Sequence, residues 1–117
     1  MTEVTLRHAQ EAVDEYVRTV VVRYFTELSN LAQLVEEIRE VARVMNRTYG
    51  DQSARNSAEQ DDLADELADV LAVVLAIANQ TGTDHTAAFL ANLETKTIRD
   101  RNRHYNNPKL TDLPQRD

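Results

Sequence analysis

Apolar residues recur at steps of three and four along most of the chain, which is the period of an amphipathic helix. One such stripe runs through residues 6–24 and a second through 28–45. After a polar segment at 48–60, the chain is apolar on every side over residues 70–78, and a last apolar stripe covers 89–93. The pattern therefore predicts four helices, at about residues 3–24, 27–47, 58–80 and 84–104.

Capping residues indicate where these helices begin and end. Thr26 or Ser29 is expected to cap the second helix, because a side-chain oxygen there accepts a hydrogen bond from a free backbone N–H. Gly82 supplies a stop for the third helix. Residues 1–107 are predicted to form one helical domain. Residues 108–117, which begin at a proline and have little apolar content, are predicted to be a flexible C-terminal tail.

The apolar content exceeds what one small chain can cover by itself. A helix that is apolar all round must be covered on every side, as in a four-helix bundle or a subunit interface. Residues 70–78 form such a stretch, and three successive valines at 20–22 add apolar surface to the first helix. The sequence predicts an all-α four-helix bundle assembled as a homo-oligomer, a dimer or a dimer of dimers, with the third helix near a two-fold axis.

Composition and charge exclude several classes of function. The formal net charge of −7 argues against nucleic acid as a partner. The chain has no cysteine, which excludes disulfides, thiolate metal sites and a cysteine nucleophile. Its longest apolar run is far shorter than the roughly 20 residues that span a bilayer, and its acidic N-terminal segment lacks the apolar core of a secretion signal. A cytoplasmic protein without membrane contact is expected.

Two acidic motifs are the main chemical signal in the sequence. EEIRE begins at Glu36, and ELAD begins at Glu66 after 25 intervening residues. On a helix, Glu37 lies beside Glu40, and Glu66 lies beside Asp69, because residues three apart share a face. If the two helices pack antiparallel, four carboxylates converge at the edge of the core, where a divalent cation would offset their repulsion. Oxygen ligands favour Mg²⁺, with Mn²⁺ as a substitute.

Other interpretations of the acids are weaker or simpler. A di-iron bundle needs Glu-x-x-His on two helices, and none of the three histidines follows a glutamate at that spacing. The acids have helical rather than loop spacing, so a calcium loop is unsupported. The simplest alternative is a solvated acidic face, which is common in a chain with 20 acidic residues.

The fourth predicted helix carries a basic stripe. Lys96, Arg99 and Arg103 follow one another at three- and four-residue steps, with Arg101 nearby. Such a stripe suits an anionic ligand such as a polyphosphate, which arginine binds through paired N–H groups. Its simpler explanation is that basic residues near a helix C-terminus interact favourably with the helix dipole.

The two acidic motifs at this spacing, with the sequence around them over roughly residues 12–107, resemble the MazG-like, all-α nucleoside triphosphate pyrophosphohydrolases of the short single-domain type. The resemblance implies Mg²⁺-dependent hydrolysis of a (d)NTP between the α and β phosphates, giving the monophosphate and pyrophosphate in nucleotide-pool house-cleaning. It implies metal ligands at the four acids named above and a water-activating role for Glu36. It further implies substrate binding by a group on the last helix: Asn92, Lys96, Arg99 and Arg103.

Three positions depart from the family pattern. Arg39 stands where the family usually has glycine, so a long cationic side chain projects near the acids. Thr95 replaces a common lysine, and Ala72 replaces a bulky or aromatic residue, which would enlarge a pocket or remove a stacking surface. Base and sugar preference therefore stay open. The alternatives are a narrower dUTP or dCTP hydrolase, a relative of phosphoribosyl-ATP pyrophosphatase, or a non-catalytic bundle that binds a nucleotide or a protein.

Overall fold

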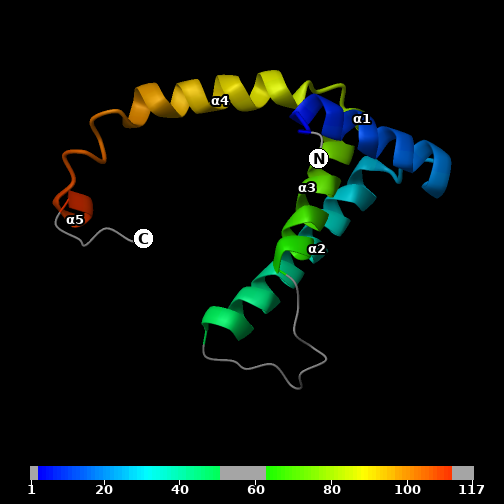
Figure 1. Ribbon diagram of the computed structural model, residues 1–117, viewed down its shortest axis with the longest axis horizontal. Helices are drawn as coiled ribbons and strands as arrows, with labels where there is room; N and C mark the ends of the chain where they lie inside the picture. Colours follow the sequence, from blue (N-terminus) through cyan, green and yellow to red (C-terminus); the bar gives the residue numbers. More distant parts are fainter. Residues whose placement is uncertain (1–2, 51–62, 112–117) are drawn as a thin grey trace. The chain divides into compact units, whose positions relative to one another are not determined.

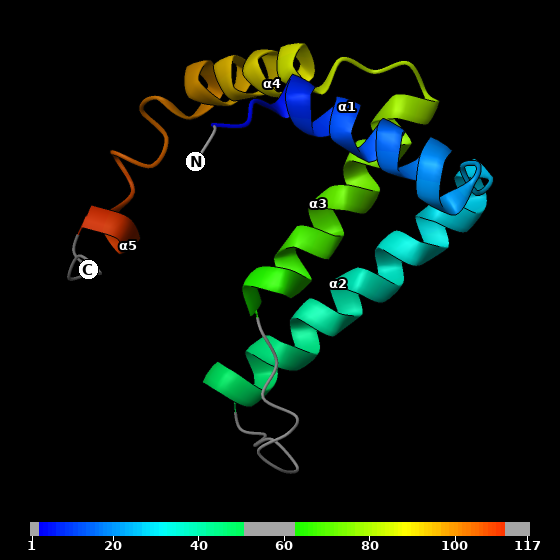
Figure 2. The same cartoon turned by 45° about the vertical axis from the view of Figure 1, so that its right-hand side comes forward.

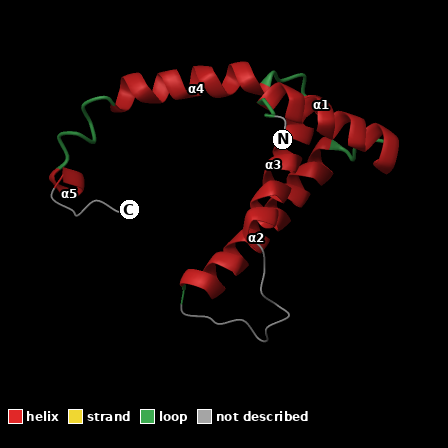
Figure 3. Ribbon diagram, in the orientation of Figure 1, coloured by secondary structure: helices red, strands yellow, loops and turns green. Residues whose placement is uncertain are grey.

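The computed structural model describes residues 3–50 and 63–111 of the chain, and helices dominate both ranges (Figure 1). Within these ranges no residue lies in a strand (Figure 3), which confirms the predicted all-α fold class. The chain forms two compact units, Met1–His85 and Thr86–Asp117, and each is described by itself. No helix in the described ranges combines the length and apolar character that crossing a membrane requires.

The first helix is shorter than the predicted 3–24. Helix α1 spans Leu6–Tyr16 and continues into a wider π-helical turn, η1, at Val17–Val21. Helical structure ends at Val22, which has a φ of 91°, a strained conformation for a β-branched residue. Thr5 caps the start of α1, since its side chain accepts a hydrogen bond from the backbone N–H of His8.

The second and third helices form an antiparallel pair and carry most of the packing in the first unit (Figure 2). Helix α2 spans Glu27–Tyr49, two residues longer than predicted, and Thr26 caps it by accepting from the Ser29 N–H. Helix α3 is described over Leu63–Gln80, so the predicted start at residue 58 lies outside the described residues. Its end at Gln80 matches the prediction.

Gly82 ends α3 as the sequence predicts. Its φ is 67°, in the left-handed region that glycine adopts without a side-chain penalty. This conformation lets the Thr83 N–H donate to the Ala78 carbonyl at 2.9 Å, which satisfies one of the free carbonyls at the helix end.

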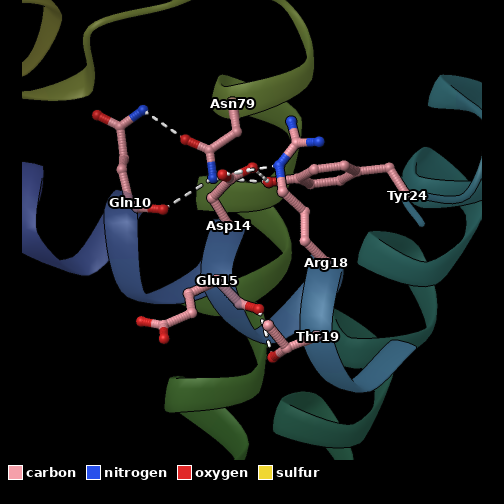
Figure 4. Close-up of polar contacts among 7 residues, drawn as sticks. All are labelled: Gln10, Asp14, Glu15, Arg18, Thr19, Tyr24 and Asn79. Atoms are coloured by element: carbon pink, nitrogen blue, oxygen red, sulfur yellow. Dashed lines mark hydrogen bonds and ion pairs between the residues drawn. The ribbon is translucent and has the colours of Figure 1, made fainter. Parts of the chain in front are cut away.

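A polar network explains why the first helix stops early (Figure 4). The Tyr24 hydroxyl donates to Asp14 Oδ1 at 2.6 Å and accepts from Asn79 Nδ2 at 3.0 Å. On a straight helix, residue 24 would lie about 15 Å beyond residue 14, too far for this bond. The reversal at Val22 therefore returns Tyr24 to α1, and Asn79 ties both to α3. Arg18 completes the network by donating to Asp14 Oδ2 at 2.9 Å.

Helices α4 and α5 lie, apart from His85, in the described part of the second unit. Helix α4 spans His85–Asp100, so it ends four residues before the predicted end at residue 104. The chain then forms turns, with backbone hydrogen bonds from the Arg103 N–H to the Asp100 carbonyl at 3.2 Å and from the Asn107 N–H to the His104 carbonyl at 3.1 Å. A short helix, α5, occupies Pro108–Thr111, at the start of the predicted tail; the Asn107 side chain accepts from the Lys109 N–H there. The division into a domain and a tail stays a prediction.

Few apolar side chains are buried in the described part of the chain. They are Val17, Val44, Leu75 and Ala78. Several large apolar side chains on α2 and α3 are instead about half exposed or more: Leu28, Leu31, Val35, Ile38, Leu67 and Leu71. Such surface is unfavourable in water, at roughly 25 cal/mol per Å².

Candidate metal centre

Three of the predicted carboxylates meet between α2 and α3. Glu37 comes from α2, and Glu66 and Asp69 come from adjacent turns of α3. One oxygen from each carboxylate lies within 4.8 Å of the others, and Glu37 and Glu66 are half-buried. The antiparallel packing of the two helices produces this convergence, as the motif spacing predicts. The spacing of the three oxygens suits shared ligation of one cation.

The electrostatics of this group are those of a site that lacks a counter-charge. The pKa of Glu66 is raised above its usual value of 4.5, first by burial and then by repulsion from Asp69, Glu40 and Glu37. In the described part of the chain, no Lys or Arg forms an ion pair with Glu37, Glu66 or Asp69. A divalent cation would remove this penalty, and an all-oxygen donor set fits Mg²⁺ or Mn²⁺.

The fourth predicted ligand, Glu40, does not join the group of three. Its Oε2 accepts from Arg43 Nη2 at 2.7 Å and from Arg43 Nε at 2.9 Å. The two residues are three apart on α2, so they share a face. Glu40 still lies near enough to raise the pKa of Glu66. Arg43 is not among the residues predicted from the sequence, although its spacing from Glu40 is the signal for this pair.

Two other residues of the EEIRE motif, Glu36 and Arg39, do not belong to the group of three carboxylates. Glu36 is exposed, and within the described residues its carboxylate makes no hydrogen bond or ion pair. Arg39 is also exposed and forms no ion pair with a described carboxylate, although it lines a surface pocket together with Glu40 and Arg43. The structure thus separates Glu36 from the clustered acids, and its role on water stays a prediction.

A glutamine contacts the cluster from the preceding turn of α2. Gln33 Nε2 donates to Glu37 Oε1 at 2.6 Å, across one helical turn. Gln33 is not among the residues predicted from the sequence, although polar pairs four apart on a helix are a known signal.

Gln33 also lines a cavity of about 350 Å³ between η1, α2 and α3. The walls are mostly apolar and include Val17, Tyr24 and Val73. Ala72, the position where the family has a larger residue, forms part of the same wall. Because Asp69 lies one turn before Val73 on α3, the cavity is next to the carboxylate group.

The predicted phosphate-binding residues all lie in the second unit. Asn92 and Lys96 are exposed on α4, and Thr95 donates its hydroxyl to the Ala91 carbonyl at 3.1 Å. Arg99 binds Asp100 through two hydrogen bonds of 2.9 Å, which lower the pKa of Asp100 to about 2. Arg103 also approaches Asp100, at 3.5 Å.

The two arginines of the predicted stripe therefore share one carboxylate, and binding of phosphates by this stripe stays a prediction.

Comparisons with known proteins agree with this geometry. A family model described as the MazG nucleotide pyrophosphohydrolase domain matches residues 25–104, which is more than half of the chain. The curated protein YpjD of Bacillus subtilis (strain 168), described as uncharacterized, is 36% identical over 62 residues, or 53% of this chain and 54% of that protein. The aligned segment thus spans about half the length of that curated relative.

Two solved structures have the same fold. The crystal structure of YpjD from Bacillus subtilis superposes with a TM-score of 0.74 at 29% identity, covering 86% of this chain and 100% of that one. The Bacillus-conserved MazG protein, a nucleotide pyrophosphohydrolase, gives a TM-score of 0.68 at 30% identity, covering 81% and 91%. The matched segment contains both acidic motifs and the three carboxylates that meet between α2 and α3. The chain belongs to the MazG nucleotide pyrophosphohydrolase family.

Proposed function

We propose that this protein hydrolyses nucleoside triphosphates between the α and β phosphates, giving a nucleoside monophosphate and pyrophosphate in a Mg²⁺-dependent reaction. The observation that carries the proposal is the convergence of Glu37, Glu66 and Asp69, none of which forms an ion pair with a described Lys or Arg. A triphosphate alone would be repelled by these acids, so a metal–nucleotide complex is the substrate form that the site favours. Family membership supports the same reaction.

The acidic residues divide between metal binding and activation of water in the proposed reaction. Glu37, Glu66 and Asp69 would hold Mg²⁺, and Glu40 would join them by exchanging Arg43 for the ion. The bound ion would polarise the α-phosphoryl group and lower the pKa of a coordinated water. Glu36 is exposed and has no partner among the described residues, so it is available to accept a proton from the attacking water.

The cavity beside the carboxylates suits the nucleoside part of the substrate. Its apolar walls offer a surface for an uncharged ring, while the carboxylates and their ion would hold the charged phosphates. Lys96, Arg99 and Arg103 on α4 are proposed to bind phosphate oxygens and to stabilise the departing pyrophosphate, as the family resemblance implies.

A panel of nucleotides tests the proposal. The eight common ribo- and deoxynucleoside triphosphates would be incubated with the protein in Mg²⁺ and, separately, in EDTA. We expect pyrophosphate and monophosphate in equal amounts with Mg²⁺ and neither product with EDTA. Release of orthophosphate instead of pyrophosphate would contradict cleavage at the α–β bond, and no product from any nucleotide would contradict the enzymatic function.

We further propose that the protein acts as a homo-oligomer, at least a dimer. The support is the amount of exposed apolar surface on α2 and α3, where Val35 is 60% and Leu67 52% exposed. A second copy of the chain is the partner that would cover such faces symmetrically. Light scattering should give a mass of at least twice 13.3 kDa. A single active species at the chain mass would contradict the assembly.

A further inference from the structure

Gln33 contacts the three-carboxylate group and also lines the neighbouring apolar cavity. Its Nε2 donates to Glu37 Oε1 at 2.6 Å, and its side chain forms part of the wall of the apolar cavity. A carboxylate only accepts hydrogen bonds, so the amide nitrogen rather than the amide oxygen must face Glu37. The contact therefore fixes the orientation of both side chains.

The hydrogen bond leaves Glu37 prepared for a cation. One of its oxygens, Oε1, is occupied by the amide donor, so the other oxygen is the better placed of the two for a metal ion. Residues that orient a metal ligand through such a contact also reduce the freedom that the ligand loses when the ion binds. In the described part of the chain, Gln33 is the only side chain that donates a hydrogen bond to a member of the three-carboxylate group.

We propose that Gln33 is a positioning residue that holds the Glu37 carboxylate ready for the metal ion and, through the same side chain, links that carboxylate to a ring bound in the cavity. The inference rests on the proposed function for the identity of the ring as a nucleobase. The part that concerns metal binding stands without it, because Gln33 contacts Glu37 whether or not a nucleotide is present.

The substitution Gln33→Met tests whether Gln33 positions Glu37 for the metal ion. Methionine has nearly the same length and favours helix, but it cannot donate to Glu37. We expect a roughly tenfold loss of Mg²⁺ affinity, measured by calorimetry with the metal alone, which is the lower end of the range for residues that orient a ligand. The Mg²⁺ concentration that half-activates turnover should rise by the same factor.

The matched control is Gln80→Met. Gln80 is also a helical glutamine, but it donates to the Phe25 carbonyl and accepts from Asn30, away from the carboxylates. It should lower the melting temperature without changing Mg²⁺ affinity. Equal Mg²⁺ affinity in Gln33→Met and the wild type would overturn the positioning role, and this outcome is independent of whether the protein hydrolyses nucleotides.

A comparison of Ala76→Leu with Gln33→Met tests the proposed link between Gln33 and a ring bound in the cavity. Ala76→Leu narrows the cavity from α3 without touching the contact between Gln33 and Glu37. It should raise the KM for nucleotide and leave Mg²⁺ affinity unchanged, whereas Gln33→Met should change both. If Gln33→Met leaves the KM at saturating Mg²⁺ unaltered, the link to the cavity is wrong.

Discussion

Two carboxylates of the first unit, Asp14 and Glu66, occupy opposite electrostatic environments. Asp14 accepts hydrogen bonds from Tyr24 and Arg18, and its pKa is lowered, chiefly by the Tyr24 hydroxyl. Glu66 is surrounded by other acids, and its pKa is raised by burial and by their charge. The first carboxylate has partners among the described residues, while the second forms no ion pair with any of them.

This difference gives Asp14 a structural role, whereas Glu66 belongs to the proposed ligand site. The network around Asp14 joins α1, the chain reversal and α3, and it gives that end of the helices a fixed geometry. The acids around Glu66 repel one another, and either protonation of Glu66 or a bound cation would relieve that repulsion. The acids of the proposed metal site are therefore those that form no ion pair with a cationic side chain among the described residues.

The largest expected effect is the loss of turnover in Asp69→Asn. Removing one metal ligand should lower activity by more than the 10- to 100-fold that is typical for residues that only orient a ligand. The matched change Asp14→Asn should lower the melting temperature but keep Mg²⁺-dependent hydrolysis. Steady-state assays at saturating Mg²⁺ compare the two. If folded Asp14→Asn lost as much activity as Asp69→Asn, the distinction between the structural acid and the proposed metal ligand would be wrong.

A second prediction separates Glu36 from the clustered acids. Because Glu36 is exposed and outside the group of three, Glu36→Gln should lower kcat by roughly 10² to 10⁴, the usual range for a general base, while metal affinity holds. Kinetics and calorimetry on the same preparation measure both. A parallel loss of metal binding would make Glu36 a ligand.

The sequence predicts the acid cluster well because its basis is local and periodic. The three-residue spacing within each motif places the acids of a helix on one face, so antiparallel packing of α2 and α3 brings three of the four acids together. The early end of α1 was not predictable, since it depends on Tyr24 reaching Asp14 and Asn79, and Asn79 lies 55 residues after Tyr24.

The partners of individual acids were also not predictable from spacing. Both Glu37 and Glu40 have a polar residue within one turn, yet Gln33 leaves the first available to a metal ion, while Arg43 neutralises the second. Which side chain binds which carboxylate depends on rotamers and on the neighbouring helix. Spacing along one helix does not contain that information.

A third prediction concerns the pH dependence of stability without metal. Raising the pKa of Glu66 means that its ionised form opposes folding, so Glu66→Gln should raise the melting temperature at neutral pH in EDTA. The gain should shrink as the pH falls through the raised pKa of Glu66, where the wild-type group becomes neutral. Asp14→Asn should behave oppositely, because its stabilising charge persists until the pH falls through a lowered pKa.

Thermal melts of the two variants and the wild type across this pH range provide the measurement. A destabilised Glu66→Gln at neutral pH would show that the glutamate has a partner in the protein after all.

The smallest expected effect is that of Tyr24→Phe. This change removes the hydroxyl that bridges Asp14 and Asn79, and it should cost about 1 kcal/mol of unfolding free energy, the typical net value of a hydrogen bond. Urea denaturation gives the value. Mg²⁺ affinity should match the wild type; a clear fall would mean that the Asp14 network and the metal centre are not independent.

We expect a divalent ion to bind between α2 and α3 at Glu37, Glu66 and Asp69. The most direct test is the anomalous X-ray scattering of crystals grown with Mn²⁺, which locates the ion without reference to activity. We predict an anomalous peak within coordination distance of carboxylate oxygens from all three residues. A peak at other residues only, or no peak at a Mn²⁺ concentration that supports turnover, would contradict the account.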